Sequence, residues 1–222
     1  MTEEPNGFKD GIPLTAPVLA TSVHKLNPLG QRVVVKLIDT EIKTKNGVVL
    51  PERIHQSFNR IGRVLAVANG RWQGHTYPMY VKNGDICFFQ LEQQQASNTS
   101  YIDKEHGMVF FLHNLDMIGT LSEPSFDLDF FQVVGTWMLV KVGLRSTLKN
   151  SRIILPDSEN TTHELQTYTL VQKGSGVGID VNVGDELSLV RSRCNPIYLG
   201  NQLYGWIEEK FVYGAMTSES VA

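Results

Sequence analysis

"RVVVKL" (residues 32–37) is a run of β-branched residues between polar neighbours, and "WMLVKV" (residues 137–142) repeats its pattern 105 positions later. β-Branched side chains are stiff and pack well on a pleated surface, so both runs predict strands. The same spacing recurs downstream, where "VVLP" (residues 48–51) is matched by "IILP" (residues 153–156). Two matches in one order and at one distance indicate an internal repeat, and a repeated unit predicts a repeated domain.

A third match shows where the two copies differ in length. "VKNGD" (residues 81–85) is matched by "VNVGD" (residues 181–185) after only 100 positions, so the second copy lacks five residues. The shortening falls where "RWQGHTYPMY" (residues 71–80) corresponds to "SGVGID" (residues 175–180), and such insertions occur in surface hairpins and loops. The chain is therefore predicted to comprise an N-terminal arm (1–29), a first domain (30–121), a linker (122–129), a second domain (130–216) and a tail (217–222).

Both copies are rich in short β-branched and aromatic runs, each bounded by Gly, Asn or Asp. No window of helical length carries apolar residues at a 3.6-residue spacing. A small sheet must close on itself or pair with another sheet to bury its inner face. The sequence therefore predicts an all-β protein with two small barrels or sandwiches in tandem, and places first-copy strands at residues 33–35, 63–67, 86–89 and 109–112.

The composition narrows the class of protein. Of the 222 residues, 41% are hydrophobic and 19% are charged, which suits a packed core. The net charge of −3 gives no reason to expect nucleic acid or an acidic membrane as the main partner. Two cysteines 107 positions apart, Cys87 and Cys194, indicate a reducing compartment. With no signal peptide, no transit sequence and no apolar run of about 18 residues, the sequence predicts a soluble, non-secreted protein.

Catalytic and metal-binding patterns are absent from the sequence. The six histidines form neither HxH nor HExxH, so metal binding is a weak hypothesis. The glycine-rich stretch at residues 174–178 lacks the lysine and helix of a phosphate loop and predicts a tight turn. The Gly-Asp pairs at residues 84–85 and 184–185 predict turns whose aspartates cap backbone amides. We expect no catalysis and no cofactor.

Several aromatic residues leave nucleic-acid binding open as a minor hypothesis. Aromatic side chains can stack bases, but the surrounding lysines and arginines that would hold a phosphate backbone are missing. The residues concerned are Trp72, Tyr77, Tyr80 and Trp206.

The apolar tripeptides of the repeat stand in polar surroundings. Taken alone, each could be one more core strand. However, Asn46-Gly47 precedes Val48, Val49 and Leu50, and Pro51 follows them, so pairing on both sides is disfavoured. The second copy keeps the arrangement, with polar residues before its tripeptide and a proline after it; its members are Ile153, Ile154 and Leu155.

The first copy resembles a subunit of the GroES-type co-chaperonins. The motifs that carry the resemblance come in the order and at the spacing of that family, and they are "PLGQRVVVKL", "NGVVLPE", "GRVLAVANG", "VKNGDICFF" and "VFFLHNLDMIGTL". The second copy resembles the family more distantly, through "MLVKV", "IILP", "VNVGD" and "YGWIEEKFVYGAM". A tandem of two such domains is similar to the double co-chaperonins of chloroplasts, although no transit peptide is present here.

The resemblance implies an irregular β-barrel for each copy, a seven-fold ring, and a mobile loop that docks on the apical domain of a GroEL-type chaperonin. Its docking residues would be Val48, Val49 and Leu50, together with Ile153, Ile154 and Leu155 of the second copy. A roof hairpin would fall at about residues 71–80. The implied function is that of a cytoplasmic, ring-forming lid on an ATP-dependent chaperonin, without catalytic activity of its own.

A second function class is a structural one. The divergent second copy, the bulky residues after Pro51 and the 29-residue arm suggest a specialised or bacteriophage-encoded member. In a virus the same two barrels could be a virion component, such as a head-decoration or tail protein.

Overall fold

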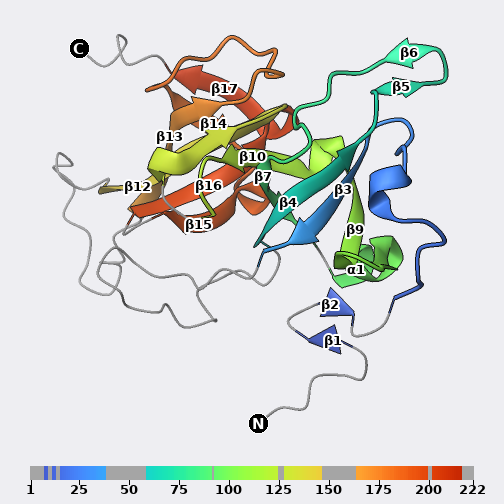
Figure 1. The fold of residues 1–222 in the computed structure, drawn as a ribbon. Helices are drawn as coiled ribbons and strands as arrows, with labels where there is room; N and C mark the ends of the chain where they lie inside the picture. Colours follow the sequence, from blue (N-terminus) through green and yellow to red (C-terminus); the bar gives the residue numbers. More distant parts are fainter. Residues whose placement is uncertain are drawn as a thin grey trace, which may run out of the picture. The chain divides into compact units, whose positions relative to one another are not determined.

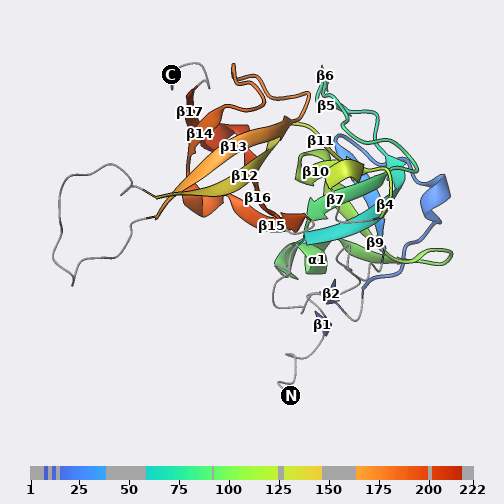
Figure 2. The same ribbon diagram turned by 90° about the vertical axis from the view of Figure 1, so that its left-hand side faces the viewer.

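The computed structural model describes residues 8–9, 12–13, 16–38, 59–91, 93–124, 128–146, 164–199 and 202–216. Within these residues the protein is almost entirely β-structure (Figures 1 and 2), as the sequence predicts. The chain forms two compact units: the first runs to Gly135 and includes Gly174–Gly176, and the second holds Thr136–Lys173 and the chain from Val177 onward. Among the described residues, no helix is long and apolar enough to cross a membrane.

The first unit is built on a seven-stranded antiparallel sheet with the order β11-β10-β7-β4-β3-β9-β8. The sheet contains the four strands that the sequence predicts in the first copy, within β3, β4, β7 and β9. Its strands are β3 (Arg32–Leu37), β4 (Asn59–Val67), β7 (Ile86–Gln90), β8 (Ser100–Asp103), β9 (Gly107–His113), β10 (Met117–Leu121) and β11 (Phe131–Val133).

Two short strand pairs and one α-helix also belong to the first unit. β1 (Phe8–Lys9) pairs with β2 (Ile12–Pro13), and β5 (Arg71–Trp72) pairs with β6 (His75–Thr76). The helix α1 (Gln93–Thr99) lies between β7 and β8 in the chain, where the sequence indicates no helix.

The second unit has a six-stranded antiparallel sheet with the order β15-β16-β12-β13-β14-β17. Its strands are β12 (Trp137–Ser146), β13 (Glu164–Lys173), β14 (Glu186–Leu189), β15 (Asn195–Leu199), β16 (Gln202–Glu208) and β17 (Val212–Met216). This order matches β8-β9-β3-β4-β7-β10 of the first sheet, strand for strand along the chain. Both sheets also carry a bulge at corresponding positions, between Val34 and Val35 and between Leu139 and Val140.

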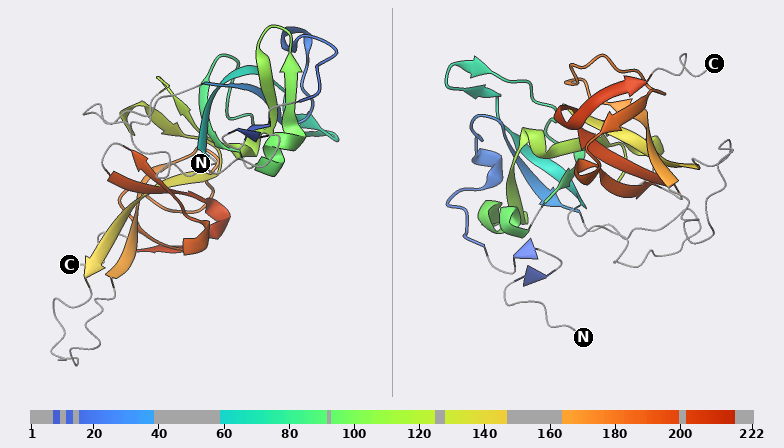
Figure 3. Two further views of the ribbon diagram at one scale, coloured as in Figure 1. Left: turned by 90° about the horizontal axis from the view of Figure 1, so that it is seen from below. Right: turned by 180° about the vertical axis from the view of Figure 1, so that it is seen from behind.

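Figure 3 shows that each sheet is strongly curved. The pairings between described strands leave an open edge at both ends of each sheet, so they do not close either one into a barrel. Closure of the two sheets as tandem barrels therefore stays a prediction.

The two Gly-Asp turns have one geometry, and the predicted role of their aspartates is confirmed. Asp85 Oδ2 accepts the Lys82 amide at 2.9 Å, and Asp185 Oδ2 accepts the Asn182 amide at 2.8 Å. The glycine before each aspartate has a positive φ, 91° at Gly84 and 100° at Gly184. Such angles favour glycine because a Cβ would clash with its own backbone.

Each unit has its own core. In the first unit a cluster on one face of the sheet includes Val33, Val35 and Phe89, all 0% exposed. In the second unit the corresponding cluster includes Met138, Val140 and Ile207, also 0% exposed. Side chains of β-strands point alternately to the two faces, so these residues account for one face of each sheet.

The other face of the first sheet is covered by the end of the segment that the sequence assigns to a polar arm. Val23 and Val34 are both fully buried in a second apolar cluster, with Leu19 packed against it. The Leu19 amide donates to Ile102 O at 2.9 Å, and the Ile102 amide donates to Pro17 O at 2.8 Å. Residues 16–29 of the arm thus belong to the first unit (blue in Figure 1).

Candidate functional site

The predicted docking residues lie outside the described part of the chain. These residues are Val48, Val49, Leu50, Ile153, Ile154 and Leu155. The structure does show where the connections that carry them begin and end. The β3–β4 ladder continues to the pair Leu37 and Gly62, and the Ile38 amide donates to Ile61 O at 2.9 Å. The β12–β13 ladder continues to the pair Ser146 and Glu164. Each connection therefore leaves and re-enters a sheet on neighbouring antiparallel strands.

The base of the first connection is tightly packed. A Cβ at Gly62 would overlap Val35 Cγ1 and would lie 2.9 Å from Lys36 O, so β3 and β4 approach closely only because this residue is glycine. The Cys87 thiol donates to Gly62 O at 3.3 Å from the neighbouring strand. The first unit thus holds both ends of the connection on a rigid ladder.

Neither cysteine has the character of a nucleophile. Burial, with a smaller contribution from the charge of Asp85, raises the pKa of the Cys87 thiol to about 12. Burial raises the pKa of the Cys194 thiol to about 11. Both thiols are free and remain protonated at neutral pH, which is the state of a packing residue rather than a reactive one.

A β-hairpin stands at the position predicted for the roof. β5 and β6 are joined by Gln73 and Gly74, whose φ values of 49° and 81° are both positive. A two-residue turn with two positive φ angles matches the twist of a hairpin. The existence of the hairpin is confirmed, and its counterpart in the second copy is the short glycine-rich stretch, which forms the predicted turn at residues 175–176.

One buried side chain anchors the base of this hairpin. Asn114 is 0% exposed; its Oδ1 accepts the Tyr80 amide at 2.8 Å, and its Nδ2 donates to Pro78 O at 3.0 Å. At the other side of the base, the Tyr77 amide donates to Gly70 O at 2.9 Å. The hairpin is therefore held at its root, while residues 71–78 are exposed.

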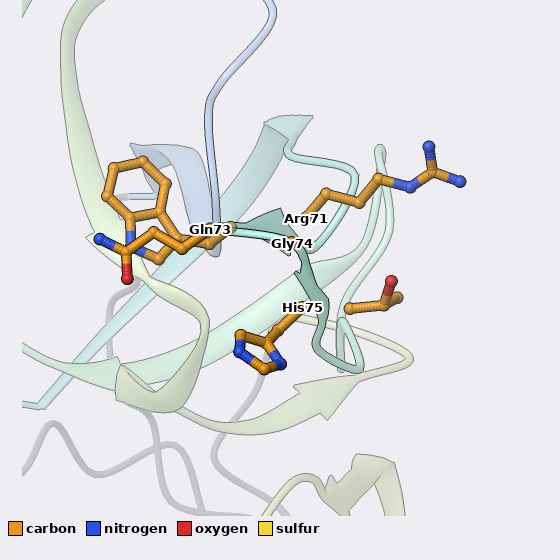
Figure 4. A pocket seen from close by; sticks show the side chains of 6 residues that line it. Arg71, Gln73, Gly74 and His75 are labelled. Carbon is orange, nitrogen blue, oxygen red and sulfur yellow. The ribbon is translucent and has the colours of Figure 1, made fainter.

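An open groove of about 440 Å³ runs along the hairpin, and residues 71–76 line it. In Figure 4 the Arg71 side chain points away from Gln73 and His75, so these polar groups do not converge. A ligand site normally gathers polar groups from several elements around an apolar pocket, whereas this groove is lined by a single hairpin. It has the form of a surface hairpin rather than an active site.

The aromatic residues considered for base stacking are not brought together. Trp206 is fully buried in the second unit, and Tyr80 packs against Gly135 in the first. Only Trp72 and Tyr77 remain on the surface, at 51% and 37% exposure. The structure gives no continuous stacking surface among these four residues.

Sequence reasoning missed one group that the fold assembles. His24, Glu105 and His106 meet on the surface of the first unit, with the two imidazole Nε2 atoms 3.0 Å apart and His24 Nε2 3.4 Å from Glu105 Oε1. The histidines are 82 positions apart in the chain, so no local spacing motif could indicate them. Only the packing of the N-terminal segment brings them together.

Comparison with known proteins gives one consistent result. The family described as "Chaperonin 10 Kd subunit" matches residues 25–120. The chain is 33% identical over 98 residues to the co-chaperonin GroES of Pediococcus pentosaceus, covering 43% of this chain and 98% of that protein. It is 37% identical over 99 residues to GroES of Marinobacter nauticus, covering 44% of this chain and 98% of the relative.

A relative with higher identity is matched over a shorter part. GroES of Thermus thermophilus is 47% identical over 66 residues, which span 29% of this chain and 64% of the relative's length. The residues that the family matches, 25–120, all fall in the first unit. The matches to nearly full-length relatives show that the chain belongs to the chaperonin 10 kDa subunit family.

Proposed function

We propose that this protein is a co-chaperonin: a non-catalytic, ring-forming lid that caps a GroEL-type, ATP-dependent chaperonin. The observation that carries the proposal lies in the matched first copy. There the tripeptide Val48–Leu50 falls on a long connection whose two ends are fixed on the neighbouring strands β3 and β4. A rigid base with an apolar segment in the middle of the connection is what docking to a second protein requires. The proposal includes two GroES-like barrels in tandem, of which the second carries Ile153–Leu155.

Energetic considerations favour many weak contacts over one strong contact. Burying three Val or Leu side chains contributes roughly 5–8 kcal/mol at about 1.5–3 kcal/mol each. Fixing the backbone of a connection on binding costs about 1–2 kcal/mol per residue ordered, so a single copy would bind weakly. A ring that presents several copies to a matching ring gains from effective concentration without any new contact. The lid can then bind tightly and still be released.

The pairing of β11 with β10 is a model for contacts between neighbouring chains in a ring. β11 begins the second copy of the repeat, and β10 is the last strand of the first copy. The two strands pair through Gly119 with Val133 and Leu121 with Phe131. β17 is the counterpart of β10, and among the described strands it pairs only with β14. We infer that the segment before β3 of a neighbouring chain pairs with β17 as β11 pairs with β10. Head-to-tail contacts of this kind form a ring when the rotation from one chain to the next closes on itself.

The hairpin at residues 71–80 has the form of a roof element. It is exposed from residue 71 to residue 78 and rooted by Asn114. In the proposed ring the first copies would place their hairpins around the axis, and the second copies would leave it open. The chamber would therefore be lined by the hairpin of the first copy only.

The test replaces each tripeptide by three serines, separately and together, in the full chain. Light scattering with a GroEL-type chaperonin and ATP measures capping, and refolding of a chaperonin-dependent client measures function. We expect the wild type to form a ring that joins the chaperonin only with nucleotide, and the Val48–Leu50 serine variant to form the ring but not the complex. The variant of Ile153–Leu155 shows whether the second copy also docks.

A matched control is Val183→Ser, which changes an apolar residue that is 65% exposed in a turn of the second unit. It should cap normally. Capping by the Val48–Leu50 serine variant would contradict the docking assignment, and a chain that ignores the chaperonin altogether would contradict the proposed function. The relatives reported above are all named co-chaperonins, which favours this function over that of a virion protein.

A further inference from the structure

His24, Glu105 and His106 form a surface cluster outside the tripeptide connections and the hairpin used by the proposed function. One ligand-type atom from each of the three side chains lies within 4.8 Å of the other two. The imidazole rings meet edge to face, with centroids 4.8 Å apart, and their Nε2 atoms are 3.0 Å apart. His24 Nε2 is also 3.4 Å from Glu105 Oε1. Three donors thus converge on one point from two separate segments of the chain.

Both segments are fixed by backbone hydrogen bonds and packing. His24 lies in a 3-10 turn (Val23–Lys25) whose first residue is fully buried, and the Leu26 amide donates to Val23 O at 3.0 Å. Glu105 and His106 lie in the tight turn between β8 and β9, closed by the pair Asp103 and Gly107. The backbone under all three ligands is therefore fixed, while their side-chain ends are accessible to solvent.

Two of the three separations between ligand atoms are close to those of a metal centre. Two nitrogens each about 2.0–2.1 Å from a tetrahedral zinc ion lie about 3.3–3.4 Å apart. The observed separation of 3.0 Å between the Nε2 atoms would need to increase by only a few tenths of an ångström. The 3.4 Å between His24 Nε2 and Glu105 Oε1 already has the required value.

We propose that His24, Glu105 and His106 bind a divalent transition-metal ion, with zinc as the preferred ion. Two imidazole nitrogens and one carboxylate oxygen form a ligand set that suits zinc better than magnesium or calcium, which favour oxygen-only sites. Three protein ligands leave a fourth position of the tetrahedron for water. The ion would join the N-terminal segment to the β8–β9 turn, and so fasten the segment that covers the outer face of the first sheet.

The alternative is a metal-free contact. Two neutral imidazoles at 3.0 Å can share one N–H···N hydrogen bond, with complementary tautomers. This contact needs no Glu105 and no ion. The two possibilities differ in zinc affinity and in the response of residues 16–29 to zinc.

Isothermal titration of the metal-free full-length protein with zinc chloride tests the proposal. We expect one ion per chain for the wild type, a loss of that binding in His24→Ala and His106→Ala, and weaker binding in Glu105→Gln. Cobalt(II) in place of zinc should show the visible absorption of a tetrahedral complex with nitrogen ligands. Magnesium chloride should give no heat of binding.

His75→Ala provides the matched control, because His75 is an exposed histidine on the hairpin of the same unit. It should bind zinc as the wild type does. Hydrogen exchange gives a second readout: zinc should slow exchange at residues 16–29 in the wild type and in His75→Ala, but not in His24→Ala. Equal zinc binding by wild type and His106→Ala, or no zinc binding by the wild type, would overturn the proposal. Chaperonin capping is measured separately, so neither result depends on the other.

Discussion

The two sheets of this protein keep the same strand order but fill their cores differently. In the first unit Leu37 on β3 pairs with Gly62 on β4, and Phe89 on β7 lies close to Gly62. At the corresponding positions the second unit has Tyr168 on β13 and Leu189 on β14. The large aromatic side chain is therefore on β7 in the first unit, whereas in the second unit it is on β13, the counterpart of β4. The comparison teaches that the ladder, the bulge and the Gly-Asp turn define the fold, while core volume can be redistributed around them.

The elements that differ most are those that project from the sheets. The first copy of the repeat has the hairpin of residues 71–80, where the second copy has the short turn at residues 175–176. The first sheet also has β11 beside β10, and among the described strands nothing corresponding lies beside β17. Divergence between the copies is therefore concentrated where the proposed lid would meet its neighbours and its chamber.

The largest expected effect is the difference in reactivity between the buried thiol of the first unit, Cys87, and the thiol of the second unit, Cys194. The pKa values of about 12 at Cys87 and about 11 at Cys194, against 9.0 for a free thiol, reduce the thiolate fraction by about 1,000-fold and about 100-fold. Reaction with a disulfide reagent at pH 8 should therefore be slow at both sites and slower at Cys87. Peptide mass spectrometry resolves the two rates.

The urea-unfolded chain is the control for these rates, because both thiols should then react alike. If Cys87 reacted as fast as Cys194 in the native protein, the first sheet would open more easily than its packing indicates. Because both pKa values are raised, the stability linked to these thiols is complete below pH 9 and is lost as the pH rises through the folded-state values.

The second prediction tests whether the large side chain can be placed on either of the two neighbouring strands. Gly62→Tyr should destabilise the first unit by about 3 kcal/mol, because even its Cβ would overlap Val35 and lie 3.1 Å from Phe89. Adding Phe89→Leu copies the arrangement of the second unit and should recover at least about 1 kcal/mol through coupling of the two sites. Hydrogen exchange of β3 and β4 peptides under increasing urea measures the change.

The mirror experiment changes Tyr168→Gly and Leu189→Phe in the second unit. Its double variant should likewise be more stable than the sum of its single changes. Strictly additive effects in both units would show that the two side chains of each pair do not compensate for each other. The pairs would then correspond only in their position on the strands.

A third prediction concerns the turns that the two units share. Gly84→Ala and Gly184→Ala should each cost about 1–2 kcal/mol, since both positions have a positive φ and no neighbour within 4 Å that could complicate the effect. Gly214→Ala is the control, because it has equal space but no positive φ, and it should change stability by less than about 0.5 kcal/mol. Clearly unequal costs at Gly84 and Gly184, measured by hydrogen exchange of each unit, would break the comparison.

Much of each sheet could be predicted because its signals are local. The β-branched run of β3 alternates between two buried faces, and each Gly-Asp pair marks a turn by its own residue types. The repeat also predicted the second sheet, because corresponding residues lie 105 positions apart at Lys36 and Lys141 and 100 positions apart at Asp85 and Asp185.

The remaining features depend on contacts between distant residues. The helix α1 has the sequence QQQASNT, in which Ala96 is the apolar residue, so no apolar stripe indicates it. The segment from Pro17 to Leu26 alternates irregularly between apolar and polar residues, and only the burial of Val23 shows that it covers a sheet. The cluster of His24 and His106 follows from that packing. The predicted tripeptides remain predictions because they lie outside the described residues.

The smallest expected effect lies in a turn that the two units stabilise differently. In the second unit the turn Glu209–Phe211 has Arg193 and Lys210 over the Phe211 ring at 5.3 and 5.1 Å. In the first unit the corresponding turn is capped by Asp116, whose Oδ2 accepts the His113 amide at 2.9 Å and Gln95 Nε2 at 3.0 Å. Burial nevertheless raises the pKa of Asp116 above its usual 3.8, so these hydrogen bonds do not fully offset the cost of burying the charge.

A raised pKa in the folded state means that the stability linked to Asp116 is complete below pH 3.8 and is lost as the pH rises through the folded value. Asp116→Asn keeps an oxygen to accept the His113 amide but carries no charge, so it escapes that loss. The variant should equal the wild type in acid and become more stable at neutral pH, by less than about 1 kcal/mol for a partly compensated group. Urea unfolding of the first unit between pH 3 and pH 7 measures the difference. A variant that is less stable than the wild type at neutral pH would mean that the carboxylate's hydrogen bonds outweigh its burial, and that the charged cap, rather than a neutral one, suits this turn.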